Sequence, residues 1–442
     1  MKRSVPITLG SLLATAGLLG MAAPVAAAHV TDHAASNSRR ISAKAKRKVS
    51  AKSHKPITLT ILWEASPAAT ATLNAAAAAF QKTHPWVHFS YDFVPSGQST
   101  KFRLDLAGGT PPDIVHMDSV YTDAFAAGGE LMDLSKYGAN KLASKYLPIT
   151  WKTVTYKGQV YSLPFDTNTI CLQYNIKLFK KAGISHPPTN WNQLVTDARL
   201  IKQKTGDWGY EIPTSPEVSG WLQYNFLTWL WREGGHVLNK SQTKAIYNSP
   251  AGVAALDKLI YLGDHGLVPK DSYNEGGFYS GQYGMIDDGS WQVPNWSKNV
   301  GGEHNFVRFA LLPQLKPGVP AYDDLGLYNL SIPRTAPHPH TAWEFMEFLS
   351  TNLKYQLMYD ESQGFIPSLK AGEKVAFYKK YPWPIFEKEL TLSKIRPEVP
   401  AWPEIATDMG NALQAALSGI ESPQQALNTA VKQDDQALAS SP

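Results

Sequence analysis

The fold is decided by the segment from residue 57 to residue 118, which reads ITLTILWEASPAATATLNAAAAAFQKTHPWVHFSYDFVPSGQSTKFRLDLAGGTPPDIVHMD. Alternating β-branched and apolar residues open it, an alanine-rich run follows, and the same succession then repeats. The pattern predicts strands at 57–63, 87–94 and 114–117, with helices at 68–82 and 102–107 between them. Strands separated by helices form βαβ units, so we predict an α/β protein with a parallel sheet.

Polar and aromatic side chains follow two of these predicted strands directly. Trp63 and Glu64 end the first strand, and Asp118 ends the third. Ligands of open α/β sheets bind at the carboxyl ends of the strands. We therefore expect all three side chains to contact a ligand, although Trp63 could instead finish the core and Asp118 could cap a helix.

A second informative stretch, residues 278–296, reads FYSGQYGMIDDGSWQVPNW. An apolar strand ends there in a turn with Asp288 and Gly289, and Trp291 follows at once. A flat ring beside carboxylates suits a polyhydroxylated ligand, because the ring covers C–H faces and the carboxylates accept hydrogen bonds from hydroxyls. The alternative is a core tryptophan next to an aspartate that caps a helix.

The N-terminus has the features of a secretory signal peptide. Two basic residues precede an apolar run that ends in Pro-Val-Ala-Ala-Ala, and we predict cleavage after Ala28. A membrane anchor is the alternative. Residues 29–55 contain eight basic residues and one acidic residue and are predicted to be a disordered linker.

The basic character of the chain belongs to this N-terminal part. The whole chain carries 42 basic and 37 acidic residues, whereas residues 56–442 carry 32 and 36, a net charge of −4. The folded part therefore gives no reason to expect a nucleic-acid partner.

Motifs for catalysis and cofactors are lacking in the sequence. Cys171 is the only cysteine, so no internal disulfide or CxxC site can form, and no cysteine near the cleavage site could carry a lipid. HExxH, GxGxxG, GxxxxGK[ST] and GxSxG do not occur. We expect no metal, no cofactor and no catalytic residue. A glycoside hydrolase that recruits Asp166, Asp287 and Asp288 is the enzyme alternative.

Five segments resemble one protein family and occur in the family's order. They are YKGQVYSLPFDTNTICLQYNIKLFKKAGISHPP (156–188), GGTPPDIVHMDS (108–119), FYSGQYGMIDDGSWQVPNW (278–296), HTAWEFMEFLST (340–351) and GFIPSLK (364–370). The chain thereby resembles extracellular solute-binding proteins of family 1, the sugar-binding proteins of ABC importers related to maltose-binding protein. The family lipoproteins of Gram-positive bacteria carry a lipidated cysteine, which this chain lacks.

The resemblance implies a two-lobe periplasmic-binding-protein fold of type II, hinge-connected, with ligand in the cleft between the lobes. Chain crossings are expected near Pro164, near residues 312–314 and near Thr351. Lobe one would then comprise residues 56–164 and 313–350, and lobe two residues 165–312 and 351–442.

The resemblance also implies that Trp291 stacks on the ligand and that Asp166 and Asp118 are cleft carboxylates. Further candidates have a packing role as their alternative. They are Asp288, Glu64, Trp63, Trp221, Tyr224, Tyr328, Asn329 and Trp402.

The function implied is capture of a mono- or oligosaccharide outside the membrane and its delivery to permease subunits, with ATP hydrolysed by a separate chain. The protein would be a secreted monomer, periplasmic or at the extracellular face of the cytoplasmic membrane. Closure around the ligand would follow from its higher affinity for the closed form. A cationic solute such as a polyamine is the alternative ligand.

Overall fold

The computed structural model describes residues 54–212, 219–269, 277–278, 280–294 and 306–441, with the side chains of 219–221 excepted. The predicted signal peptide, 1–28, and all but the last two residues of the predicted linker, 29–55, lie outside the described residues. Within the described ranges, no helix combines the length and the apolar character that crossing a membrane requires.

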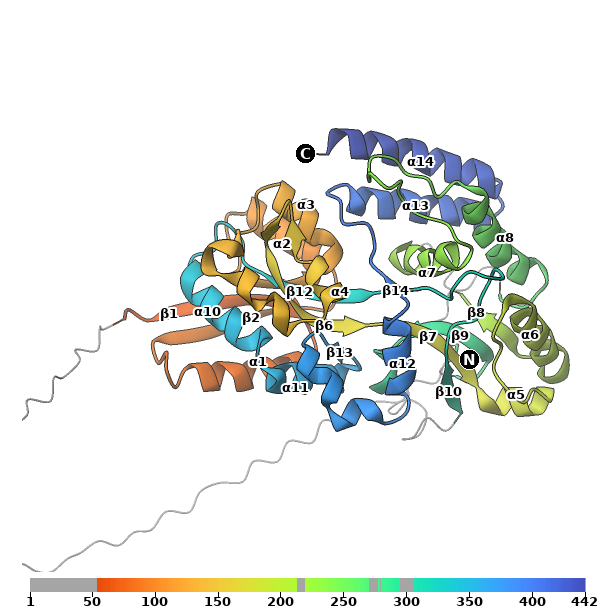
Figure 1. Cartoon of the computed structure of the whole chain (residues 1–442), viewed down its shortest axis with the longest axis horizontal. Helices are drawn as coiled ribbons and strands as arrows, with labels where there is room; N and C mark the ends of the chain where they lie inside the picture. The colour runs from red at the N-terminus through yellow and green to blue at the C-terminus, as the bar shows by residue number, and fades with distance from the viewer. Residues whose placement is uncertain (1–53, 213–218, 270–276, 279, 295–305, 442) are drawn as a thin grey trace, which may run out of the picture. The chain divides into compact units, whose positions relative to one another are not determined.

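The first sheet has six strands in the order β13-β6-β12-β3-β1-β2 (Figure 1). Strands β1, β2 and β3 are parallel, as the βαβ pattern predicts, and β12 and β6 are antiparallel to their neighbours. The strands are β1 (Ile57–Glu64), β2 (Val87–Val94), β3 (Ile114–Asp118), β6 (Ser162–Asn168), β12 (Gly326–Ser331) and β13 (Ile366–Pro367).

The local sequence explains why a helix forms directly after β1. Ser66 accepts a hydrogen bond from the Ala69 amide as the N-cap, Pro67 occupies the first turn, and the alanine-rich run provides high helix propensity. The helices packed near the sheet are α1 (Pro67–Phe80), α2 (Gln98–Ala107), α3 (Thr122–Ala127), α4 (Pro148–Lys152), α10 (Pro339–Ser350) and α11 (Leu353–Gln363).

The second sheet has four strands in the order β10-β7-β9-β8. Strand β9 is antiparallel to β7 and parallel to β8. The strands are β7 (Ile170–Asn175), β8 (Trp208–Glu211), β9 (Tyr283–Gly289) and β10 (Val307–Ala310). Together the two sheets confirm the predicted two-lobe α/β class.

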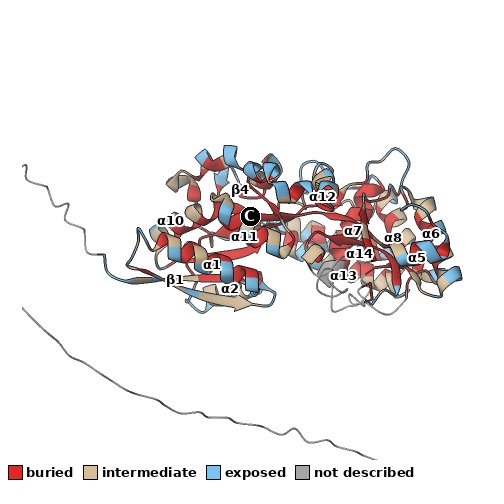
Figure 2. Cartoon of the chain, turned by 90° about the horizontal axis from the view of Figure 1, so that it is seen from below, coloured by how far each residue is buried: buried red, intermediate tan, exposed pale blue. Residues whose placement is uncertain are grey.

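Apolar helices cover this sheet and form the largest core cluster with it. In Figure 2 the strands of this sheet are mostly buried, while the outer faces of its helices are exposed. The helices are α5 (Ile176–Ala182), α6 (Trp191–Thr205), α7 (Ser219–Arg232), α8 (Pro250–Asp264), α12 (Trp383–Leu390), α13 (Trp402–Leu417) and α14 (Pro423–Ser440).

Short elements complete the described chain. They are the strands β4 (Thr155–Tyr156), β5 (Gln159–Val160), β11 (Asp323–Asp324) and β14 (Ser393–Lys394), and the 3₁₀ turns η1 (Ser119–Tyr121), η2 (Leu134–Tyr137), η3 (Ala139–Lys145), η5 (Lys370–Lys374) and η6 (Ala376–Lys379).

The chain passes between the two sheets at places that differ from the expected crossings. Strand β6 ends at Asn168 and β7 begins at Ile170, so the change of sheet falls at Thr169, and Pro164 lies inside β6. A second connection runs through β11, which pairs in parallel with β14.

The segment after residue 351 also departs from the expected division. Helix α11 packs on α1, and β13 pairs with β6, so this segment belongs with the six-stranded sheet rather than with lobe two. The physical reason is the apolar face of α11, whose Tyr355 and Tyr359 are buried in the core cluster of the first sheet.

Candidate functional site

The middle of the six-stranded sheet places three candidate residues side by side. Tyr328 of β12 lies opposite Asp118 of β3 on one side and opposite Asp166 of β6 on the other. Antiparallel pairing of β12 with both neighbours therefore brings together residues that are far apart in the chain.

Beneath Tyr328 lies a stack of rings that the sequence analysis did not identify. The His116 ring stacks on Trp63 with centroids 3.9 Å apart and on Tyr328 with centroids 5.0 Å apart. Its Nε2 lies 2.9 Å from an Asp166 carboxylate oxygen. The one signal in the sequence is a lone polar residue inside the apolar strand 114–117.

Asp166 therefore does not offer an open carboxylate to a ligand. Its side chain has no exposed surface and holds the His116 ring. Burial raises the pKa of Asp166, and the His116 hydrogen bond opposes that shift. In this structure Asp166 supports the Tyr328 ring through His116, which corrects the expectation of direct contact.

Three other candidates are also core residues. Trp63 is fully buried and its Nε1 donates a hydrogen bond to Tyr359 at 3.3 Å. Asn329 is fully buried and its Nδ2 donates to the Thr153 carbonyl at 3.1 Å. Trp402 starts α13 inside the core of the second sheet and is 1% exposed. Strand alternation and helix packing turn these side chains inward, so the packing alternative holds for all three.

Asp118 and Arg396 form the central charged pair of the site. The two terminal guanidinium nitrogens of Arg396 donate to the two Asp118 oxygens at 2.9 and 3.0 Å, a bidentate geometry. Asp118 also accepts from the Val120 amide at 3.2 Å and so caps η1. Arg396 lies 3.5 Å from Asp324 as well. No local pattern in the sequence points to Arg396, because its partner Asp118 is 278 positions away.

Glu64 ends β1 as a half-buried carboxylate. It accepts a hydrogen bond from the Gln98 side chain at 2.9 Å. Burial raises the pKa of Glu64, and the hydrogen bond from Gln98 opposes the shift. The residue keeps partial access to solvent, so contact with a ligand stays a prediction.

Tyr224 connects the charged pair with Trp291. The Arg396 guanidinium lies 5.3 Å from the centre of the Tyr224 ring, and the Trp291 ring lies 6.3 Å from it. The Tyr224 hydroxyl donates to the Asp324 carbonyl at 3.2 Å. Asp118, Arg396, Tyr224 and Trp291 therefore form one continuous cluster of side chains.

Trp291 is neither a core residue nor a free surface ring. It is half-buried against a small cluster of Ile170, Tyr224, Leu312 and Ala321. A Cβ at residue 289 would overlap the Trp291 ring, so glycine at that position allows the ring to fold over the turn. One side of the ring thus packs on the protein and part of it stays accessible.

The carboxylates beside Trp291 have local roles. Asp288 accepts hydrogen bonds from the Gly289 amide at 2.7 Å and from the Gln292 side chain at 2.8 Å. Neither bond is that of a helix N-cap, since Asp288 lies inside β9. Asp287 forms a buried ion pair with Arg232. The candidate Trp221 lies in α7, and its side chain lies outside the described residues.

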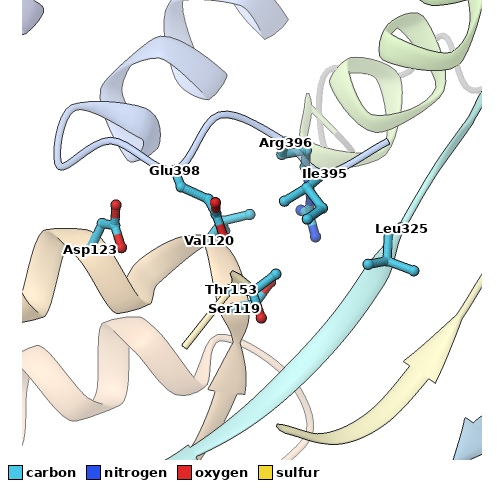
Figure 3. A pocket seen from close by; sticks show the side chains of 8 residues that line it. All are labelled: Ser119, Val120, Asp123, Thr153, Leu325, Ile395, Arg396 and Glu398. Carbon is cyan, nitrogen blue, oxygen red and sulfur yellow. The ribbon is translucent and has the colours of Figure 1, made fainter. Parts of the chain in front are cut away.

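A small pocket adjoins the Asp118–Arg396 pair (Figure 3). Its walls come from η1 and α3, from the end of α4, from the start of β12 and from the chain after β14. The lining residues are Ser119, Val120, Asp123, Thr153, Leu325, Ile395, Arg396 and Glu398.

Comparison with known proteins identifies the family. The profile of the bacterial extracellular solute-binding proteins matches residues 64–352, well over half of the chain. The chain therefore belongs to this family, as its resemblance implied.

Individual relatives agree with this assignment. The chain is 25% identical over 380 residues to a Brucella abortus protein described as a binding protein. This alignment covers 81% of the present chain and 88% of the relative. The chain is 24% identical over 362 residues to the sn-glycerol-3-phosphate-binding periplasmic protein of Salmonella paratyphi A, covering 75% and 80%. A crystal structure of the cyclic alpha-maltosyl-1,6-maltose binding protein of Arthrobacter globiformis superposes with a TM-score of 0.74 at 25% identity, covering 87% and 99%.

Proposed function

We propose that this solute-binding protein captures a mono- or oligosaccharide and delivers it to the permease subunits of an ABC importer. The observation that carries the proposal is the accessible part of the Trp291 ring in one continuous cluster of side chains with the Asp118–Arg396 pair. The ring would cover the apolar C–H face of a sugar, while the carboxylate and guanidinium groups would exchange hydrogen bonds with its hydroxyls.

The similar Arthrobacter protein supports a saccharide ligand, because its name states that it binds a cyclic maltosaccharide. The similar Salmonella protein binds a polyol phosphate. Arg396 could serve a phosphate, but its guanidinium is already engaged by Asp118 in bidentate fashion and lies near Asp324. A second anion would have to displace these carboxylates, so a neutral or cationic polyol suits the site better.

The hydrolase alternative is weakened by where its carboxylates lie. Asp166 is buried against His116, Asp287 is buried against Arg232, and Asp288 is buried in β9, where it accepts a hydrogen bond from the Gln292 side chain. A glycosidase needs two carboxyl groups that flank one bond of the substrate. We therefore infer a binding role without catalysis.

The mode of action would be closure of two lobes about the chain crossings. Thr169 and the β11–β14 pair would act as the connections, with the six-stranded sheet in one lobe and the four-stranded sheet in the other. Ligand contacts from both lobes would favour the closed form, which the permease recognises. The mature protein would be a secreted monomer that begins at His29, with ATP hydrolysed by a separate chain.

Isothermal calorimetry on the mature protein tests the ligand class. The panel contains maltose, cellobiose, trehalose and their monosaccharides, with sn-glycerol-3-phosphate and spermidine as rivals. We expect a saccharide to bind most tightly, and exclusive binding of the phosphate would contradict the proposal. Loss of uptake of the radiolabelled sugar in a deletion strain would then connect binding to import.

A further inference from the structure

We propose that the pocket beside Arg396 receives a primary ammonium group of the ligand, so that the preferred ligand is an amine-bearing saccharide. This inference rests on the proposed saccharide function and specifies it. Asp123 and Glu398, which lie next to each other in the wall of the pocket (Figure 3), would accept the hydrogen bonds of the ammonium group.

Asp123 is the observation that points to a ligand. Asp123 lines the pocket and is 7% exposed as a whole residue. Among the residues that the structure describes it accepts no side-chain or backbone hydrogen bond and forms no ion pair, although solvent still reaches its carboxylate oxygens. Buried carboxylates are normally paired, because an unpaired one loses its hydration without compensation. The cost of burying Asp123 is consistent with a partner that arrives from outside the chain.

Glu398 faces the same pocket from the segment between β14 and α13. Its Oε1 is buried, and within the described part of the chain it has no hydrogen-bond partner. Burial and the neighbouring Asp123 raise the pKa of Glu398 to about 8, while Lys152 opposes the shift, and burial raises the pKa of Asp123 to about 6. Two carboxyl groups that are hard to ionise side by side would both be stabilised as anions by one cation.

The nearby cation of the pocket wall cannot fill this role. Arg396 is committed to Asp118 in bidentate fashion and lies 3.5 Å from Asp324. Lys152 is a further cation near Glu398. Arg396 is balanced by its bidentate pair with Asp118 and brings no spare positive charge to Asp123 and Glu398. An added positive charge is therefore favoured here.

The rest of the wall suits an amine attached to a carbon skeleton. Ser119 and Thr153 supply hydroxyl oxygens, which are further acceptors for the three N–H donors of an ammonium group. Val120, Leu325 and Ile395 form the rest of the wall, and the free volume of about 10 Å³ holds a single group the size of an ammonium, so the adjoining carbon atoms would lie outside it. A metal ion is a poorer match, since the described residues contain no group of three or more His, Cys, Asp or Glu side chains placed to hold one.

The pocket lies next to the residues proposed to bind the sugar. Ser119 follows Asp118 directly, and Arg396 lines the pocket while it binds Asp118. A saccharide ring near Tyr224 and Trp291 could thus place an amino substituent in the pocket. Polyamines present the same ammonium chemistry without the ring, and the experiment separates the two sources.

The test uses matched ligands that differ in one substituent. Calorimetry at pH 7.5 compares the β-1,4-linked glucosamine disaccharide with cellobiose and with N,N′-diacetylchitobiose, and compares glucosamine, galactosamine and mannosamine with their parent hexoses. Spermidine is the ring-free amine. In at least one matched set we expect the amine to bind about 10- to 100-fold more tightly than the hydroxyl analogue, the usual range for a charge-assisted hydrogen bond.

Two variants and two matched controls assign this preference to the pocket. Asp123→Asn and Glu398→Gln keep the side-chain size and remove the charge, and each should bring the amine-to-hydroxyl affinity ratio close to one. Asp257→Asn and Glu373→Gln make the same chemical changes at exposed positions and should preserve the ratio. Melting curves establish that each variant is folded, and Glu398→Gln serves alone if the more buried Asp123→Asn does not fold.

The possible outcomes separate this inference from the proposed function. Equal or tighter binding of the neutral sugars overturns the ammonium pocket and leaves saccharide capture standing. Binding of spermidine alone, with loss in Asp123→Asn, supports the pocket and overturns the saccharide function. The absence of binding by every amine overturns the pocket whatever the neutral sugars do.

Discussion

Replacing Trp291 with alanine is the most direct test of the site. The indole ring is half-buried over Gly289 and lies 6.3 Å from the Tyr224 ring. The substitution removes the ring and leaves the Asp118–Arg396 pair, whose two hydrogen bonds do not involve Trp291. Ligand affinity and folding stability should therefore change by different amounts.

The expected magnitudes follow from the burial of the ring. Loss of one aromatic stacking partner removes about 1–3 kcal/mol of binding free energy, which is about 5- to 150-fold in Kd. A fully buried tryptophan would cost about 3–5 kcal/mol of stability on truncation. Because part of the Trp291 ring is already exposed, we expect a smaller loss of about 1–2 kcal/mol.

Calorimetry with the best saccharide and denaturant unfolding should be measured on the same protein samples. Trp402→Ala is the control, because Trp402 is 1% exposed in the core of the second sheet and should lose about 3–5 kcal/mol of stability with little change in Kd. Unchanged sugar affinity in Trp291→Ala, together with a stability loss as large as that of Trp402→Ala, would refute the assignment of Trp291 to the ligand site.

Three further predictions concern other parts of the chain. Gly289→Ala should displace the Trp291 ring, since the new Cβ would overlap it, and should weaken sugar binding about 10-fold by calorimetry; full affinity would show that the ring position is unimportant. Burial raises the pKa of Glu389 to about 8, above its usual 4.5, so the native state holds the proton more tightly and stability should fall as pH rises from about 5 to 8. Glu389→Gln keeps an oxygen acceptor for the Leu312 amide and should reduce this loss of stability with pH, measured by urea unfolding. Glu373→Gln is the surface control. An unchanged pH dependence of stability in Glu389→Gln would contradict the prediction. The intact mass of the native protein should show a start at His29 without a lipid adduct. Deletion of residues 29–55 should leave Kd and Tm nearly unchanged. A loss of Tm beyond a few degrees would show that the segment packs on the folded part.

The sequence alone determined the α/β class, the first three parallel strands and the place of Trp291 just after a strand. The alternation at 57–63 and the alanine-rich run after it are local signals, because strand and helix periods depend on neighbouring residues. The strand that precedes Trp291 is a local signal as well, although β9 continues through Asp288 and Gly289 and the turn begins at Ser290, later than predicted. These features were predictable because each is encoded within a few positions.

The tertiary structure alone decided which side chains reach the site. Trp63 and Trp402 follow or begin elements as a ligand contact would, yet packing buries both of them. Asp166 is turned to His116 by its place in β6, and Asp118 is paired with Arg396 from the far end of the chain. Burial and ion pairing join residues 50 and 278 positions apart, so no local pattern could reveal them.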